Sequence, residues 1–409
     1  MRGFRRLTIG LLICGGLPLA AADVPVMILR FPGGWQDDGF WTAIKAASDG
    51  RVYVGLCGHG GSARMYVYEP AMKEIRHLAM MQRAVHEENM GREPQGKLHS
   101  QIVEDPEGNL WFGTDMASHS YLGMWDDPRA YPGGHMMLYH PKTNLLRDLG
   151  ILAPGAGIRH IALDSERQRI YAVTFPRGDF YLYDMKTQRS YFKGRVNNVD
   201  SIARVMVKDD RGNIYGSFAP YGIFKYDIDK EQLVDLPVTI PHLEGPWCDR
   251  GHFHRENIWR NAAWDPVEKV IWGMEMGSAT FFRFDPNKNA METLGQLVSP
   301  EFEGERIVPY TSHGFALHPN RKIYYTAPLA TYDKPTPLIE FDTKTRRERI
   351  LGGLVDKSGW IPAGIEGCSI GPDGSIYFAG WVKPTGAKST SKREGAVLGL
   401  IILKASDIP

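Results

Sequence analysis

The chain has 409 residues, and its formal net charge is +1 at pH 7. This balance gives no electrostatic footprint for nucleic acid or for a membrane surface, so we expect neither as a partner. Hydrophobic residues make up 43% of the chain, and the 10 Trp, 18 Tyr and 17 Phe are ample for a packed core. Length alone would allow two or three domains, but no Pro/Ser-rich linker divides the sequence.

The first 22 residues have the three zones of a secretory signal peptide. Basic MRGFRR is followed by the apolar run LTIGLLICGGLPLA and then by AADVP. We expect cleavage near Ala21 or Ala22, which leaves a secreted or periplasmic protein with no membrane span in the mature chain. An N-terminal anchor is the alternative, although the apolar run is short and broken by glycines.

Seven strand-like phrases, each ending in an aromatic residue, recur along the rest of the chain. The clearest copies are DPEGNLW (105–111), DDRGNIY (209–215) and GPDGSIY (371–377). An Asp/Gly turn beside a β-prone run is typical of two antiparallel strands joined by a tight turn. Spacings of 44 to 60 residues match one four-stranded sheet with its turns. The repeated aromatics are Tyr53, Trp111, Tyr171, Tyr215, Trp272, Tyr324 and Tyr377.

A second short pattern follows each of the first six phrases. It is an aromatic residue followed by an acid, except in the second copy, where a histidine takes the place of the acid. Turns such as DMKTQ (184–188) and DTKTR (342–346) come next, which indicates a second pair of strands. The six steps are Tyr68-Glu69, Tyr139-His140, Tyr183-Asp184, Tyr226-Asp227, Phe284-Asp285 and Phe341-Asp342.

Four short antiparallel strands, A to D, therefore make one unit, and seven units make a seven-bladed β-propeller. The seventh copy lacks the aromatic-acid step, and the apolar run AVLGLIILKA (396–405) takes its place. The strand-like segment VPVMILRF (24–31) is available to complete this last blade, so the N- and C-terminal strands would close the ring. Residues 23–409 are thus predicted to be a single all-β domain. An array of β-sandwiches is the alternative, but it would need additional linkers.

In such a propeller, residues before each strand A and in each loop from B to C share one end of the axis, the upper face. Most histidines outside strand turns fall at these positions, and arginines join them. Such convergence is typical of an active site. The residues before the A strands are Trp41, Thr42, His99, Arg159, His160, Arg204, Asn257, Arg260, His313 and Glu366. Those in the B-to-C loops are Cys57, His59, His119, Tyr121, Arg177, Tyr221, Glu275, Tyr332 and Trp381.

Four of these residues form the candidate catalytic wall. His99 begins strand A of the second unit and His119 lies in the loop after its strand B, so the two are neighbours by topology. Arg204 and Tyr221 occupy the corresponding places in the fourth unit. The alternative for Tyr221 is a plain loop aromatic.

Other histidines at strand starts have a structural alternative. Taken alone, His160 or His313 would more often be a hydrogen-bonded packing residue near the axis.

A Cys/His cluster precedes the strand A of the fifth unit. PWCDRGHFHREN (246–257) places Cys248, His252 and His254 within seven residues, and His313 follows one blade later. These ligand types suit zinc in a tetrahedral site, although the spacing is not that of a zinc finger. Hydrogen-bonded loop histidines and a buried thiol are the alternative.

The cysteines do not form a disulfide framework. Cys57, Cys248 and Cys368 would remain after signal cleavage, and an odd number leaves at least one outside any intrachain disulfide. Cys57 and Cys368 border the same face and are possible substitute metal ligands.

Two long loops stand out from the repeat. Residues 115–135 are rich in aromatics and glycine, and Tyr121, Trp125 and Tyr131 would suit stacking on sugar rings. Residues 382–395 are polar and basic, which predicts either a mobile solvated tip or a segment that attracts a polyanion.

These motifs resemble those of β-propeller polysaccharide lyases, especially ulvan lyases and enzymes that cut rhamnosyl-glucuronate bonds. The resemblance rests on KLHSQIVED with His99, DMASHSYLG with His119, and IARVMVKDDRGNIYG followed by FAPYGIF, with Arg204 and Tyr221. It implies a histidine pair, a tyrosine and an arginine around a uronate, and zinc near the ring centre. The implied zinc ligands are Cys248, His252, His254 and His313.

The residue types fit β-elimination independently of the resemblance. Removing the C5 proton of a 4-linked uronate requires neutralisation of the carboxylate, which Arg204 can supply. Proton transfer needs groups that titrate near working pH, and we assign Tyr221 or His99 as base and the other as acid. His119 would help to bind the carboxylate. The expected substrate-binding residues are Arg159, Arg177, Arg260, Tyr121 and Trp125.

Two other functions remain as alternatives to a lyase acting on an anionic uronate polysaccharide. One is a non-catalytic carbohydrate-binding propeller, against which the histidine pair counts. The other is a calcium-dependent hydrolase or lactonase-type propeller, for which Glu366, Asn257 and Glu275 make a thin cage. The protein is expected to be a monomer, and calcium is possible in place of zinc.

Overall fold

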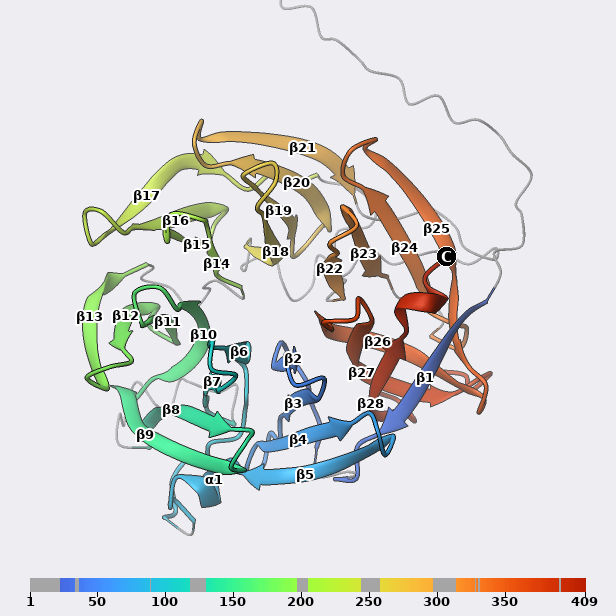
Figure 1. The fold of residues 1–409 in the computed structure, drawn as a ribbon, viewed down its shortest axis with the longest axis horizontal. Coiled ribbons are helices and arrows are strands. Elements are labelled where there is room, and N and C mark those ends of the chain that lie inside the picture. The colour runs from blue at the N-terminus through green and yellow to red at the C-terminus, as the bar shows by residue number, and fades with distance from the viewer. Residues whose placement is uncertain are drawn as a thin grey trace, which may run out of the picture.

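The computed structural model describes residues 23–33, 37–88, 90–117, 130–196, 205–243, 258–296, 314–327, 329, 332–389 and 391–409. Strands in these ranges form five separate four-stranded sheets and one eight-stranded sheet. Figure 1 shows the sheets arranged in a ring, with successive units following one another around it. The predicted all-β propeller class is confirmed.

Each separate sheet contains four strands in sequence order, A to D from the axis outward. Unit 1 contains β2 (Ile44–Ala46), β3 (Val52–Leu56), β4 (Arg64–Glu69) and β5 (Glu74–Met80), followed by the short helix α1 (Met81–Ala84). Unit 2 contains β6 (Val103–Glu104), β7 (Leu110–Gly113), β8 (Gly133–His140) and β9 (Leu145–Pro154). Unit 3 contains β10 (Gly157–Asp164), β11 (Arg169–Phe175), β12 (Asp179–Asp184) and β13 (Arg189–Arg195).

The same order continues in the next two sheets. Unit 4 contains β14 (Val207–Lys208), β15 (Ile214–Phe218), β16 (Gly222–Asp227) and β17 (Gln232–Thr239). Unit 5 contains β18 (Trp259–Asp265), β19 (Val270–Glu275), β20 (Thr280–Asp285) and β21 (Ala290–Gln296).

The eight-stranded sheet divides into two four-stranded units. Unit 6 contains β22 (Phe315–Leu317), β23 (Lys322–Thr326), β24 (Pro337–Asp342) and β25 (Arg347–Asp356). Unit 7 contains β26 (Trp360–Ile370), β27 (Ile376–Pro384), β28 (Val397–Leu403) and the N-terminal β1 (Val24–Arg30), and a 3-10 turn η2 (Ala405–Asp407) follows. The described strands therefore follow the four-stranded repeat order that the sequence predicts.

The N-terminal strand completes unit 7 as expected from the sequence. β1 pairs antiparallel with β28, with Met27 opposite Ile402. Its first residues also pair in parallel with β25, with Val24 opposite Leu354, and this pairing joins units 6 and 7 into one sheet. Both ends of the described chain are thus fixed in the same blade.

The Asp/Gly phrase is a turn that an aromatic side chain anchors. Asp105 Oδ1 accepts the backbone N–H of Asn109 at 2.8 Å, while Gly108 has a φ of 84° that favours glycine. The indole N–H of Trp111 donates to Asp105 Oδ2 at 2.8 Å. Equivalent bonds join Tyr215 to Asp209 at 3.1 Å, Trp272 to Asp265 at 2.9 Å and Tyr53 to Asp49 at 2.9 Å.

The acid of the aromatic-acid step caps the turn between strands C and D. Asp184 Oδ1 accepts the backbone N–H of Thr187 at 2.7 Å and its hydroxyl at 2.9 Å. Asp342 Oδ1 accepts the N–H of Thr345 at 2.9 Å in the same way. This local bonding explains why these turns use Asp and Thr.

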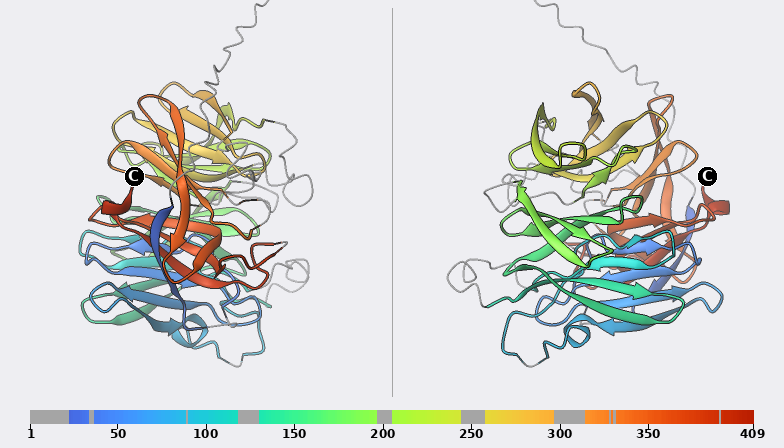
Figure 2. Two further views of the ribbon diagram at one scale, coloured as in Figure 1. Left: turned by 90° about the vertical axis from the view of Figure 1, so that its right-hand side faces the viewer. Right: turned by 60° about the vertical axis from the view of Figure 1, so that its left-hand side comes forward.

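The connections between strands lie at two opposite ends of the ring. Because each unit is an antiparallel meander, the B-to-C loops share one end with the connections from D to the next strand A. The A-to-B and C-to-D turns occupy the other end. Figure 2 shows the sheets from the side, between these two ends. No helix in the described part of the chain is long and apolar enough to cross a membrane.

Candidate functional site

The upper face of unit 1 carries a stack of aromatic rings that includes His99. The His99 imidazole lies parallel to the indole of Trp41, with ring centroids 5.3 Å apart. The segment that carries His99 is held by Thr42, whose hydroxyl donates to the His99 carbonyl at 2.5 Å. His99 is fully buried. The stack therefore fixes the ring of His99 at the boundary between units 1 and 2.

His59 also contacts this tryptophan. Its ring meets Trp41 edge-on at a centroid distance of 6.5 Å. His59 Nδ1 is 2.5 Å from Asp38 Oδ1, and the backbone N–H of His59 donates to the same carboxylate at 3.1 Å. Burial opposes a low pKa for Asp38, but the bonds to His59 outweigh it and lower that pKa. The Asp38–His59 pair was not identified from the sequence, which placed only His59 on this face.

An ion pair joins units 2 and 3 beside this stack. Lys97 and Asp115 exchange two backbone hydrogen bonds, of 3.0 and 2.8 Å. Asp115 Oδ2 is 3.2 Å from Arg159 Nη1, and the guanidinium of Arg159 lies 3.8 Å from the ring centroid of Phe175. Lys97, Asp115 and Arg159 are all buried. The charged groups of Lys97, Asp115 and Arg159 are therefore shielded from bulk water.

Tyr221 belongs to a separate group in units 4 and 5. It follows Pro220 in the loop between β15 and β16. Its backbone φ is 61°, a conformation that residues other than glycine rarely adopt. Its ring lies 5.6 Å from that of His242, and His242 Nδ1 is 3.3 Å from Glu275 Oε2. Glu275 also accepts the backbone N–H of Ser278 at 2.7 Å. Tyr221 is therefore placed beside a histidine that a buried carboxylate orients.

A third group lies in units 5 and 7. Glu366 is buried, and its Oε2 is 3.7 Å from Arg260 Nη2. Its Oε1 contacts the ammonium group of Lys392, which comes from the loop between β27 and β28. Lys392 and Arg393 both lie over the indole of Trp381, at 5.1 and 4.9 Å from its centroid. The Glu366 carboxylate on strand A of unit 7 therefore contacts two cationic side chains, those of Arg260 and Lys392.

Several predicted site residues lie outside the described part of the chain. The catalytic candidates in this set are His119 and Arg204, and the substrate-binding candidates are Tyr121 and Trp125. All four predicted zinc ligands, Cys248, His252, His254 and His313, belong to it as well. Among the described residues, no group of three or more His, Cys, Asp and Glu side chains is arranged to hold a metal ion.

One sequence-based interpretation is wrong, and a second holds only in part. Tyr131 is not available for stacking on a sugar, because it is buried and its hydroxyl donates to Gln95 Oε1 at 2.7 Å. Most described residues of the basic segment 382–395 beyond Lys383 are exposed, as expected for a solvated tip, but Val382 to Pro384 belong to β27 and Lys392 reaches a buried carboxylate. In both cases a contact distant in sequence decides the position of the side chain.

Two further residues have structural contacts. His160 is buried, and its Nδ1 accepts the backbone N–H of Met206 at 3.1 Å, which agrees with the packing alternative. Burial lowers the pKa of His160 to about 3, so the ring is neutral at physiological pH. Arg177 pairs with Asp179 at 3.2 Å and donates to the Pro154 carbonyl at 2.8 Å.

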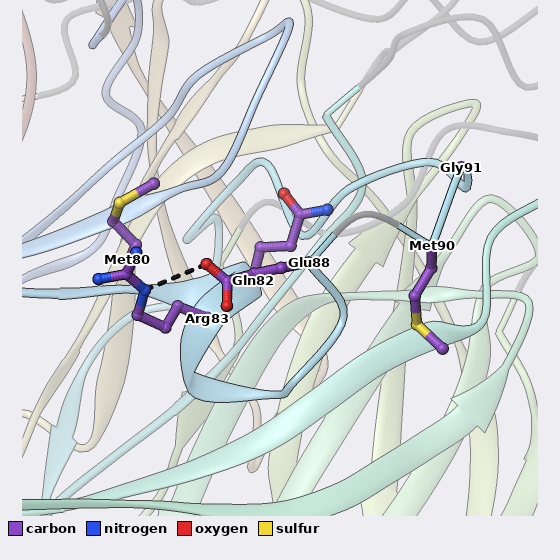
Figure 3. Close-up of a pocket in the computed structure, with 6 residues that line it drawn as sticks. All are labelled: Met80, Gln82, Arg83, Glu88, Met90 and Gly91. Atoms are coloured by element: carbon purple, nitrogen blue, oxygen red, sulfur yellow. Dashed lines mark hydrogen bonds and ion pairs between the residues drawn. The ribbon is translucent and has the colours of Figure 1, made fainter.

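A small pocket lies at the rim of this face, apart from the three groups. It is lined by Met80, Gln82, Arg83, Glu88, Met90 and Gly91, around helix α1 (Figure 3). Arg83 and Glu88 form an exposed ion pair of 3.1 Å across it. None of the predicted site residues lines this pocket.

Comparisons with known proteins support the propeller fold. Residues 94–116, which include His99 and Asp115, match the family described as "Two component regulator propeller". No curated protein matches the sequence. Among solved structures, a chain of the mitotic checkpoint complex aligns with a TM-score of 0.55 at 11% identity, covering 99% of each chain.

Two further solved structures are extracellular domains of putative one-component and hybrid two-component systems from B. thetaiotaomicron. They align with a TM-score of 0.55 at 12% and 11% identity and cover 92% of this chain. The chain spans only 40% and 39% of their lengths. At such identities the likeness shows a propeller fold alone.

Proposed function

We propose that the protein is a polysaccharide lyase that cleaves a 4-linked uronic acid, of the rhamnosyl-glucuronate type, by β-elimination. The observation that carries the proposal is the stack of His99 on Trp41 beside the buried Lys97, Asp115 and Arg159. It places a group capable of proton transfer near two buried cationic side chains, of which Arg159 is paired with Asp115.

In this proposal the C5 proton leaves while negative charge spreads onto the carboxylate. Arg204 neutralises that charge, and His119 helps to bind the carboxylate. His99 or Tyr221 removes the proton, and the other donates a proton to the leaving oxygen at C4. The His242–Glu275 contact supports Tyr221 by fixing the ring beside it. The product carries a new double bond in the uronate ring, conjugated with the carboxylate.

The test is an ultraviolet absorbance screen for that conjugated double bond over a panel of uronate polysaccharides. Sulfated ulvan, gum arabinogalactan with rhamnosyl-glucuronate ends, and uronate polymers without rhamnose should all be included. A rise in absorbance with one rhamnosyl-glucuronate polymer supports the proposal. No rise with any polymer, from folded protein prepared without chelator, would reject it.

A second candidate is a sugar-binding propeller without catalytic activity. It is favoured by the match of residues 94–116 to the regulator propeller family and by the neighbours that are extracellular domains of putative sensory systems. Binding of a polysaccharide without new double bonds would favour it. Elemental analysis tests the hydrolase alternative, since stoichiometric calcium with ester hydrolysis supports that function and zinc supports the lyase.

A further inference from the structure

The loop between β27 and β28 is anchored to the upper face by specific contacts. Lys392 reaches the buried Glu366, and its aliphatic stem occupies the space that a side chain at position 364 would fill. A Cβ on Gly364 would come within 2.8 Å of Lys392 Cδ. Lys392 therefore packs this part of the loop against β26.

Arg393 is held differently from its neighbour Lys392. Its guanidinium lies 4.9 Å from the ring centroid of Trp381, and the residue is exposed. Within the described part of the chain it makes no ion pair, whereas Lys392 is paired with Glu366. Stacking on an indole restrains a guanidinium without using its N–H donors. Arg393 thus presents N–H donors that can bind a carboxylate or sulfate group.

Arg393 lies near the ring stack that includes His99, the predicted catalytic histidine. The pKa of Asp38 is raised by burial and lowered, by a larger total, by the bonds to His59. The positive charge of Arg393 makes a further, smaller contribution to lowering this pKa. His59 meets Trp41, and Trp41 stacks on His99. The electrostatic effect of Arg393 on Asp38 and these ring contacts relate unit 7 to units 1 and 2, so Arg393 flanks the proposed cleavage site and is not part of it.

We propose that Arg393, positioned by Trp381 and by the Lys392–Glu366 contact, is an anion-binding subsite for a second acidic group of the sugar chain. The group is a sulfate or a carboxylate on a sugar next to the one that is cleaved. This inference rests on the proposed function for the identity of the polymer. It makes Arg393 a residue that determines substrate specificity.

Binding measurements test the subsite without requiring catalysis. We would measure the affinity of wild-type protein, Arg393→Ala and Arg393→Lys for sulfated rhamnosyl-glucuronate polymer and for its desulfated form, at low salt. Arg393→Ala should weaken binding about tenfold or more, because charge-assisted bonds to an oxyanion are lost. Arg393→Lys should recover only part of the affinity, since it lacks the planar fork.

Two matched variants separate the subsite from general charge attraction. Lys388→Ala removes an exposed cation from the same loop, and Arg211→Ala removes an exposed arginine from an A-to-B turn at the opposite end of the ring. Each should change affinity by less than about twofold. A loss in Lys388→Ala equal to that in Arg393→Ala, or unchanged affinity in Arg393→Ala, would overturn the proposal. So would wild-type protein that binds neither polymer.

The remaining outcomes identify the recognised group. A loss confined to the sulfated polymer assigns a sulfate, and an equal loss on both polymers assigns a carboxylate. A loss of binding in Arg393→Ala without any double-bond product from wild-type protein supports the subsite while rejecting the lyase. An active wild type with unchanged affinity in Arg393→Ala rejects the subsite alone.

Discussion

The indole of Trp111 in unit 2 packs against the ring of Tyr183 in unit 3, with centroids 6.3 Å apart. These residues belong to the two separate sequence repeats, the strand B aromatic and the aromatic-acid step. The same contact joins Tyr171 to Tyr226, Tyr215 to Phe284 and Trp272 to Phe341. In units 2 to 5 the two repeats therefore recur together because the strand B aromatic packs on strand C of the next unit.

The polar atom of Trp111 should contribute measurably to stability. Trp111→Phe keeps an aromatic ring but removes the bond to Asp105 Oδ2, and we expect the free energy of unfolding to fall by about 1–2 kcal/mol. Tyr183→Phe is the matched control, because the buried Tyr183 hydroxyl has no hydrogen-bond partner among the described residues. Urea unfolding should show little change in this control. Equal losses in both variants would contradict the role of the bond.

The capped turns should make the fold sensitive to acid. The backbone N–H of Thr187, followed by its hydroxyl, lowers the pKa of Asp184, and the N–H of Thr345 lowers that of Asp342 against a smaller effect of burial. A lowered native pKa stabilises the fold above the unfolded value, near 4, and this contribution is lost as pH falls through the native pKa. Melting temperature should therefore drop below about pH 4. Asp184→Asn and Asp342→Asn together should give a shallower drop, and an unchanged slope would argue against this source.

His135 should act in the opposite pH direction. Burial disfavours its charged form, but bonds to Asp148 at 2.8 Å and Glu87 at 3.1 Å outweigh burial and raise its pKa. A raised native pKa stabilises the fold below the unfolded value, near 6.5, and the contribution disappears as pH rises through the native pKa. The stability difference between wild type and His135→Gln should shrink from about pH 5 to about pH 9. A difference that is constant over this range would show that His135 contributes through packing alone.

The repeat made the fold predictable from the sequence, because strand period, turn chemistry and inter-unit aromatics all recur in it. Side-chain positions on the upper face were less predictable. The spacing placed His99, Tyr221 and Arg260 at the correct ends of their strands, whereas Glu366, expected just before strand A, lies within β26. It could not reveal that Glu366 joins Arg260 to Lys392, because those contacts cross from one unit to another or bring a loop back onto its own blade.

The proposed proton-transfer groups can be tested singly. His99→Ala and Tyr221→Phe should each reduce formation of the unsaturated product by about a hundredfold or more, with smaller effects on substrate affinity. His160→Gln is the control, because His160 bonds the Met206 backbone and is neutral at working pH. It should lower the melting temperature more than the turnover. Full activity in both His99→Ala and Tyr221→Phe would remove the proposed mechanism.

The predicted zinc cluster has a test that separates stability from catalysis. If Cys248, His252, His254 and His313 hold a structural zinc ion, the free energy of metal binding contributes to folding. Cys248→Ser should then lower the melting temperature more than it lowers turnover, and a chelator should destabilise wild type but not the variant. Cys368→Ser is the control, because Cys368 lies in β26 and burial raises its pKa to about 12, which disfavours the thiolate that binds metals. It should still respond to the chelator as wild type does. A metal-free preparation with the melting temperature of untreated protein would show that no metal stabilises this fold.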